Sequence, residues 1–301
     1  MTADSYSFVS YPPERLNRVI INTDAKNEAD DQYAIVHALL TPSFDLHGII
    51  PAHFGTRVAN SMEASHAEVE LLLRLMRLEG QVRVAAGAGH ALPDDRTPVP
   101  SPGAELIIAE AMKPDPRPLH VAFFGPLTDM ASALLLEPRI EEHNVRVVWI
   151  GGGPWPVGGR EFNLSNDIHA ANIIFRSRLE VWQMPSTVYR LVAVSYAELL
   201  EKVYPHGALG RYLVEQLVAW NAEHIERAME YRSLGDSPAV GAIMYPDGGR
   251  WSWQPAPEFD AQMHYLHTGR NRPIRVYETF DARFLLEDMF AKIARFARQA
   301  G

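Results

Sequence analysis

The amino-acid sequence predicts an α/β fold, in which a mostly parallel central sheet is flanked by helices and leads into a helical C-terminal lobe. Short apolar runs alternate with helical spacing of apolar residues through the first half of the chain, a pattern typical of strand–helix units with parallel strands. The 301 residues, of which 47% are hydrophobic, can bury the core of one large domain. No linker, repeat or low-complexity tract divides the sequence. We therefore expect a lead-in at residues 1–17 and a single domain at residues 18–301.

The first half of the chain is expected to contain five strands and the helices that connect them. Each strand is a short run rich in apolar and β-branched residues, whereas the helices show apolar residues three and four positions apart. The expected strands are residues 18–22, 44–52, 82–86, 119–124 and 145–150, and the expected helices are residues 30–40, 58–78, 103–112 and 127–136.

The second half of the chain is more helical. Helices are expected at residues 167–175, 194–203, 209–231, 237–244 and 282–298, and strands at residues 180–183, 188–192 and 274–280. Residues 251–275 are rich in Pro, Trp and His, which favours loops with short strands. This half supplies the expected helical lobe.

The composition excludes several classes of protein. The formal net charge is −9, which does not suit a nucleic-acid binder, because phosphate contacts need clustered Lys and Arg. The chain has no Cys, so disulfides, zinc–thiolate sites and thiol nucleophiles are excluded. It lacks both a run of about 18 apolar residues, which a membrane span needs, and the pattern of a signal peptide. A cytoplasmic location is the default expectation.

Polar or glycine-rich residues directly follow three of the predicted strands. Asp24 follows the first strand, Gly125 follows the fourth, and the glycines at residues 151–153 follow the fifth. Ligands of open parallel sheets bind outside the carboxyl ends of the strands, so these segments are expected to meet at one sheet edge. The sequence predicts the functional site at that edge.

The loop after the first strand carries four acidic residues, Asp24, Glu28, Asp30 and Asp31. Clustered carboxylates repel one another unless a positive charge lies among them. Hard oxygen ligands suit Ca²⁺, and less often Mg²⁺. Asp30 or Asp31 could instead cap the following helix, which is the alternative for this pair taken alone. A helix cap needs one carboxylate and does not require Asp24 at the strand end. The additional carboxylate favours a cation site.

At these positions the chain resembles the inosine–uridine nucleoside hydrolase family, a Rossmann-like fold whose first strand is followed by Asp-x-Asp-Pro-Gly-x-Asp-Asp. The matching residues are Asn22 and Asp24 and, after a different loop, Asp30 and Asp31. The resemblance implies that Asp24 is the general base and a Ca²⁺ ligand. It also implies that Asp31 is a bidentate Ca²⁺ ligand and that Asp30 holds a ribose hydroxyl. Asn22 replaces the first Asp of the family's pattern.

Two further segments are similar to the family's metal-binding motifs. Residues 125–129, Gly-Pro-Leu-Thr-Asp, are similar to the family's Gly-Pro-Leu-Thr-Asn, and the match implies that the backbone carbonyl of Phe124 binds Ca²⁺. Residues 235–240 stand in the place of His-Asp-Pro-x-Ala-Val, which implies that Asp236 is the distal Ca²⁺ ligand. Taken alone, the first segment is typical of an ordinary strand–helix turn.

A third segment, Glu161-Phe162-Asn163 followed by Asp167, resembles the family's Glu-Phe-Asn segment. The match implies that Glu161 and Asn163 hydrogen-bond the ribose hydroxyls, for which carboxylate and amide groups are suited. Asp167 is expected to cap the helix that begins there. Trp155, in the glycine-rich stretch before this segment, is a candidate for contact with the leaving base, with packing as the alternative.

Two departures from the family's pattern concern catalysis. The loop that replaces the family's Pro-Gly turn is two residues longer, and Glu28 in this loop is a candidate for substrate binding. Gly235 stands where purine- and inosine-type members have a His that helps to protonate the leaving base. The candidates for that acid are His224 and Tyr231 near the end of the long helix, with a surface or packing role as the alternative for each.

The resemblance implies hydrolysis of the N-glycosidic bond of a ribonucleoside, or of a related N-ribosyl compound, by a Ca²⁺-bound water. It implies a small-molecule partner, neither nucleic acid nor membrane, and a homodimer or homotetramer. The altered loop and Gly235 leave open a ribosyl- or carbohydrate-binding domain with weak catalysis or none. Strand-end Asp residues also leave open a metal-dependent hydrolase that acts on another ester or glycoside.

Overall fold

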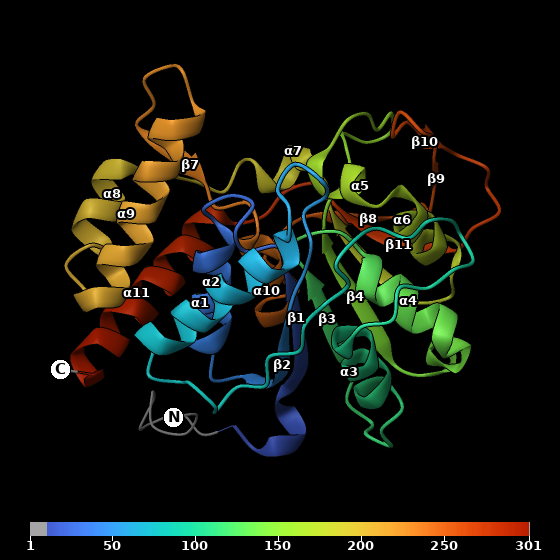
Figure 1. Ribbon diagram of the computed structural model, residues 1–301, viewed down its shortest axis with the longest axis horizontal. Helices are drawn as coiled ribbons and strands as arrows, with labels where there is room; N and C mark the ends of the chain where they lie inside the picture. The colour runs from blue at the N-terminus through green and yellow to red at the C-terminus, as the bar shows by residue number, and fades with distance from the viewer. Residues whose placement is uncertain (1–10, 301) are drawn as a thin grey trace.

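A seven-stranded sheet of order β2-β1-β3-β4-β5-β11-β8 runs through the middle of the computed structural model, which describes residues 11–300 (Figure 1). Adjacent strands are parallel, except that β8 is antiparallel to β11. The predicted mostly parallel sheet is confirmed. The strands are β1 (Asn17–Thr23), β2 (Phe44–Pro51), β3 (Leu119–Phe123), β4 (Val145–Ile150), β5 (Glu180–Met184), β8 (Trp251–Pro255) and β11 (Pro273–Tyr277).

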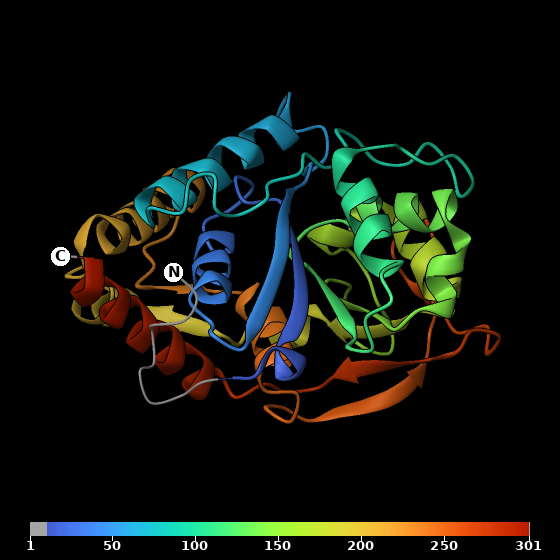
Figure 2. The same cartoon turned by 90° about the horizontal axis from the view of Figure 1, so that it is seen from below.

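Helices cover both faces of the sheet, as Figure 2 shows from below. One face packs against α1 (Asp31–Leu39), α2 (Ser61–Leu75), α9 (Gly207–His224), α10 (Ser237–Met244) and α11 (Ala282–Ala300), and the other against α3 (Pro102–Ala111), α4 (Thr128–Leu136) and α6 (Ile168–Arg176). Val19 and Ile21 of β1 belong to the first core, and Ile20 between them belongs to the second. The strands are apolar on both sides because both faces are covered.

One expected strand of the first half is wrong. Residues 82–86 join the sheet only through an isolated bridge between Ile49 and Val84. The amide of Ile49 bonds to the carbonyl of Arg83, and the amide of Ala85 bonds to the carbonyl of Ile49. The next donor on the β2 side would be Pro51, which has no N–H, so one bond of the ladder is missing, and only the bond from the Gly87 amide to the Pro51 carbonyl, at 2.9 Å, follows.

Another expected strand, residues 188–192, is also wrong. The chain forms the short helix α7 (Ser186–Tyr189) there, in which the amides of Val188 and Tyr189 bond to the carbonyl of Pro185. A strand follows only at β6 (Ala193–Ser195), which pairs with β7 (Tyr231–Ser233) outside the main sheet. The local turn after Pro185 outweighs the strand preference of the valines in this segment.

Helix ends in the second half differ from the expected ones. The helix expected at residues 194–203 begins later, as α8 (Tyr196–Lys202), because Ser195 and Glu198 form a capping box. The helix expected at residues 209–231 is α9, which ends at His224. The short helix α5 (Phe162–Asn166) was not expected.

The remaining elements are short. They are the 3₁₀ helices η1 (Pro13–Arg15) and η2 (Pro138–Glu142) and the paired strands β9 (Glu258–Phe259) and β10 (Tyr265–Leu266). Residues 1–10 of the expected lead-in lie outside the described part of the chain, and β1 already begins at Asn17. Within residues 11–300, no helix combines the length and hydropathy that a transmembrane span requires.

Candidate active site

Asp24 lies directly beyond the carboxyl end of β1, where only 1% of its surface is exposed. Gly125, beyond β3, lies against this carboxylate. A Cβ atom built on Gly125 would be 2.9 Å from Cγ of Asp24, so only glycine allows so close an approach. The carbonyl of Gly125 accepts a hydrogen bond from the Trp149 indole at 3.1 Å, which fixes the turn. The predicted meeting of these two strand ends is confirmed.

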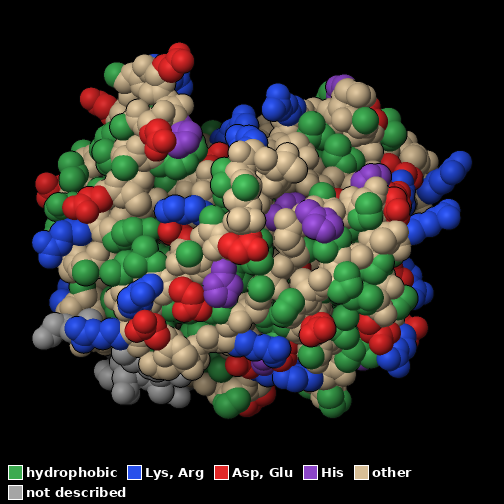
Figure 3. Space-filling view, in the orientation of Figure 1, with side chains coloured by type: hydrophobic (Ala, Val, Ile, Leu, Met, Phe, Trp, Pro, Cys, Tyr) green, Lys and Arg blue, Asp and Glu red, His purple; other side chains and the backbone are tan. Residues whose placement is uncertain are grey.

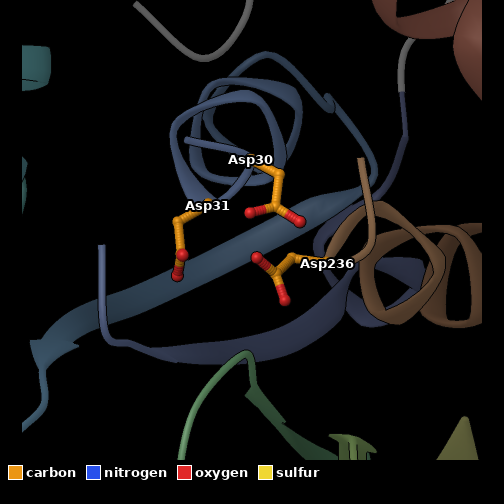
Figure 4. A group of neighbouring side chains, drawn as sticks. All are labelled: Asp30, Asp31 and Asp236. Carbon is orange, nitrogen blue, oxygen red and sulfur yellow. The ribbon is translucent and has the colours of Figure 1, made fainter. Parts of the chain in front are cut away.

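Three further carboxylates meet beside Asp24. Oxygen atoms of Asp30, Asp31 and Asp236 all lie within 4.8 Å of one another, and Figure 4 shows them converging from the N-terminal ends of α1 and α10. Asp30 stands at the N-cap of α1 without capping it, because its carboxylate accepts the amide of Gly235 at 2.8 Å. Asp31 accepts the Thr23 hydroxyl at 2.5 Å. The capping alternative is therefore wrong for Asp30, and the carboxylates face one another.

Burial and mutual repulsion disfavour the charged form of this cluster. Burial is the main cause that raises the pKa of Asp24, Asp31 and Asp236 well above the ordinary value, and neighbouring carboxylates raise it further. Burial and the charge of Glu28 raise the pKa of Asp30 to about 6. One oxygen of Asp24, Oδ2, is buried without a hydrogen-bond partner. A bound cation would remove both the repulsion and the unpaired oxygen.

Glu28 is held by an ion pair with Arg232. The guanidinium of Arg232 lies 4.2 Å from the ring centroid of Trp220, and its charge lowers the pKa of Asp30. His224 stacks on the same indole, with ring centroids 4.4 Å apart. His224 and Glu28 both line a neighbouring cavity of about 690 Å³.

Two side chains predicted to bind ribose complete the rim of the cluster. The amide nitrogen of Asn163 donates to the carbonyls of Phe124 and Ile150 at 2.6 and 2.9 Å, at the ends of β3 and β4. Glu161 caps α5 and accepts the Tyr189 hydroxyl at 2.9 Å. A carbonyl has two lone pairs, so Phe124 can accept from Asn163 and still bind a cation.

These groups share one small pocket of about 60 Å³. Its lining includes the predicted residues Asp24, Glu28, Asp30, Asp31, Phe124, Glu161, Asn163 and Asp236, together with Asn27, Ile150, Phe162, Tyr189 and Gly235. We call it the acidic pocket. Carboxylates and a backbone carbonyl are the ligands that Ca²⁺ prefers, so the donor set fits this cation.

Other predicted residues lie elsewhere. The indole of Trp155 donates to Gln183 at 3.0 Å and packs against Tyr265, with ring centroids 5.1 Å apart. Tyr231 opens β7 and is 45% exposed. Neither side chain lines the acidic pocket. Asp167 caps α6 through the amide of Ala170 at 2.8 Å, as predicted.

The sequence model of the inosine-uridine preferring nucleoside hydrolases matches residues 19–282. This chain belongs to that family. The ribonucleoside hydrolase RihC of Escherichia fergusonii is 31% identical over 189 residues, 54% of this chain and 60% of that protein. The match thus covers less than two thirds of the length of the relatives of this type. A Schizosaccharomyces pombe protein, C1683.06c, is 24% identical over 259 residues, 79% of this chain and 80% of that protein.

Solved structures of nucleoside hydrolases share the fold. The purine-preferring ribonucleoside hydrolase of Gardnerella vaginalis superposes with a TM-score of 0.77 at 21% identity, covering 94% of this chain and 100% of that one. The plant nucleoside hydrolase PpNRh1 gives a TM-score of 0.76 at 18% identity, covering 94% of this chain and 99% of that one. The predicted nucleoside hydrolase fold is confirmed.

This nucleoside hydrolase family member departs from the family's pattern at Asn22 and Asp129, and the structure joins the two departures. Nδ2 of Asn22 donates to Oδ2 of Asp129 at 2.8 Å, between buried side chains 107 positions apart. The family's pattern has Asp at the first position and Asn at the second. The acid and the amide have therefore exchanged places relative to that pattern, and in this chain a hydrogen bond joins the two positions.

The missing family His is explained by Tyr189. A Cβ atom on Gly235 would be 3.0 Å from the Tyr189 ring and 3.2 Å from Oδ2 of Asp30, so the ring fills the space beside position 235. Sequence reasoning missed Tyr189 because it placed this residue in a strand. The one available signal was Pro185 before Ser186, which favours a helix start after the proline.

Proposed function

We propose that this nucleoside hydrolase family member cleaves the N-glycosidic bond of a ribonucleoside or related N-ribosyl compound, with Asp24 as general base. The observation that carries the proposal is the buried Oδ2 of Asp24, which lacks a hydrogen-bond partner and shares a pocket with three more carboxylates. The family match and the names of the relatives support ribonucleosides as the substrate class.

We propose that Asp24, Asp31, Asp236 and the Phe124 carbonyl hold Ca²⁺, with Asp30 close enough to join them. When bound, Ca²⁺ lowers the pKa of a coordinated water and orients sugar hydroxyls. Mg²⁺ suits the site less, because it favours a strict octahedron that keeps several waters.

The residues of the acidic pocket then have distinct roles. Asp24 takes a proton from the water that attacks the anomeric carbon. The bond from that carbon to nitrogen breaks, and its electron pair stays on the nitrogen of the leaving nucleobase. The carboxylates stabilise the positive charge that develops on the sugar. Asp30, Glu161 and Asn163 bind the ribose hydroxyls, and Glu28 contributes to binding through its place in the lining.

The leaving base must gain a proton, and we propose Tyr189 as a donor beside the predicted candidates His224 and Tyr231. Its hydroxyl lies at the acidic pocket, and burial raises its pKa above the ordinary value of 10.0, so the group stays protonated at neutral pH. Tyr189→Phe should lower kcat for nucleosides roughly 10²-fold, the smaller end of the range for general acids. Steady-state kinetics with a ribonucleoside measure this loss.

p-Nitrophenyl riboside provides the control, because its leaving group departs without a proton. If Tyr189 is the proton donor, Tyr189→Phe should change kcat for this substrate little. If Tyr189→Phe slows both substrates equally, the hydroxyl instead positions Glu161, to which it donates. Tyr231→Phe and His224→Gln, assayed in the same way, test the other two candidates.

Calcium should stabilise the protein more at neutral than at acidic pH. Without a cation, the pKa of Asp30 in the folded state is raised from 3.8 to about 6. Protonated Asp30 therefore stabilises the folded state fully below the ordinary pKa, and this stabilisation is lost as the pH rises through about 6. A cation offsets that loss only where the carboxylates are charged. The Tm gain on adding Ca²⁺, measured by differential scanning fluorimetry, should be larger at about pH 7.5 than at about pH 5. An equal gain at both values would contradict a carboxylate site.

Release of free ribose from a panel of ribonucleosides, measured by a reducing-sugar assay with Ca²⁺ present, tests the proposed activity. Binding of nucleosides without release would favour a ribosyl-binding domain. Cleavage of phosphate esters instead would favour the other hydrolase chemistry. A homodimer or homotetramer and a cytoplasmic location stay predictions. Light scattering of the purified protein tests the first, and fractionation of the source cells the second.

A further inference from the structure

The acidic pocket opens beside a larger cavity of about 540 Å³. Glu161 and Phe162 line both, so the two spaces adjoin at these residues. The larger cavity brings together the loop after β2, the segment before α3, the start of α5 and the end of α7. We call it the arginine cavity, because Arg57, Arg160 and Arg190 line it.

The charge of the arginine cavity is opposite to that of the acidic pocket. Three arginines supply the positive charge, since burial lowers the pKa of the lining residue His53 to about 4 and leaves it neutral at neutral pH, and the one carboxylate of the lining is Glu161. The carboxylate of Glu161 already accepts the Tyr189 hydroxyl and the amides of Gly152 and Leu164. Among residues 11–300, no carboxylate forms an ion pair with any of the three arginines. The cavity therefore carries unneutralised positive charge in a chain of net charge −9.

The three guanidinium groups come from separate segments of the chain. Arg57 is held in place, since its Nη2 donates to Asn27 at 3.1 Å and its guanidinium lies 4.3 Å from the Phe162 ring centroid. Arg190 ends α7, 6.0 Å from the ring of Tyr189. In Figure 3, blue side chains stand at the upper middle of the molecule, over the place of α7 in Figure 1.

We propose that the arginine cavity binds an anionic group of the substrate, a phosphate or a carboxylate, while the acidic pocket holds its sugar. This inference rests on the proposed function and names its substrate class. A neutral nucleoside offers hydrogen-bond acceptors to the three guanidinium groups but no negative charge to neutralise them. A phosphate or carboxylate matches the fork of donors on arginine and forms the stronger, charge-assisted hydrogen bonds.

The arginines also solve an electrostatic problem of this site. The acidic pocket repels anions, and a negatively charged substrate would be excluded unless positive charge lay near the path of its charged group. A cavity lined by one sign of charge raises the local concentration of ligands of the opposite sign. The arrangement thus selects for a substrate with a neutral sugar and an anionic group on one side.

The kinetic test compares charged and neutral substrates that differ in one group. A ribonucleoside with its 5′-monophosphate tests a phosphate on the sugar, and uridine with orotidine tests a carboxylate on the base. We expect one charged substrate to have the higher kcat/KM. Arg160→Gln and Arg190→Gln should each lower the charged-to-neutral ratio of kcat/KM about tenfold, the loss of one charge-assisted hydrogen bond. The double variant should lower it further.

Arg270→Gln is the matched control, because Arg270 is an exposed arginine that lies outside both linings. It should leave the ratio unchanged. A neutral nucleoside that is preferred over both charged substrates, with the same ratio in all variants, would overturn the inference and leave the proposed function intact.

Calorimetry with ribose and ribose 5-phosphate makes the test independent of turnover. If no compound is hydrolysed, the proposed function fails, and the anion site is then judged by binding. Tighter binding of ribose 5-phosphate than of ribose that is lost in the Arg160→Gln/Arg190→Gln variant would support the site. Equal binding of the two sugars, together with no preference for orotidine over uridine in binding, would reject it.

Discussion

Asp24→Asn is expected to lower kcat by about 10²–10⁴-fold, the range that a general base contributes. The amide has nearly the shape of the carboxylate, so the variant keeps the close contact with Gly125 while losing the group that accepts the proton. Removing one charge also relieves part of the repulsion that raises the pKa of Asp236. The folded state should therefore be at least as stable as that of the parent without a cation. Single-turnover kinetics and urea unfolding measure the two effects.

Calcium titration separates the base from the ligand role of Asp24. With Asp31 and Asp236 intact, Asp24→Asn should keep a weakened affinity for Ca²⁺ in calorimetry, and saturating Ca²⁺ should not restore kcat. Asp247→Asn, an exposed carboxylate outside the acidic pocket, is the control for expression and handling. Full kcat in Asp24→Asn at saturating Ca²⁺ would remove Asp24 as the base.

Asn22→Asp is expected to destabilise the fold by about 3 kcal/mol, because it sets a second buried carboxylate against Asp129. Both oxygens of Asp129 have partners: Oδ1 accepts the Ala88 amide and the Ser101 hydroxyl, and Oδ2 accepts a hydrogen bond from Asn22. Adding Asp129→Asn should recover most of the loss. The new amide at position 129 can keep its oxygen toward Ala88 and Ser101 and donate through its nitrogen to the new carboxylate at position 22. Urea unfolding of the four proteins in the cycle measures the coupling.

The double variant is the control for the single one. If it is no more stable than Asn22→Asp alone, the two positions are not energetically coupled, and the exchange of acid and amide has no structural meaning. Asp129→Asn alone should cost less than Asn22→Asp, because two amides can still form one hydrogen bond.

The sequence by itself determined the sheet, the edge that carries the site and most of the acidic pocket. Strand–helix alternation fixes a parallel sheet, and in such a sheet the residues after each strand meet at one edge. Asp24, Phe124 and Asn163 were predictable because each belongs to a short motif at a strand or helix boundary. The errors at residues 82–86 and 188–192 were local, since one proline removed a bond from a ladder and another preceded a helical turn.

Tertiary structure decided what depends on contacts between distant segments. The hydrogen bond of Asn22 with Asp129 spans 107 positions. The backbone amide that donates to the Asp30 carboxylate belongs to a residue 205 positions away. No period or motif encodes such pairs, because each side chain is compatible alone with many neighbours. The same holds for Tyr189 beside Gly235 and for the arginines that share one cavity. Their roles follow only from the space and charge that the folded chain leaves around them.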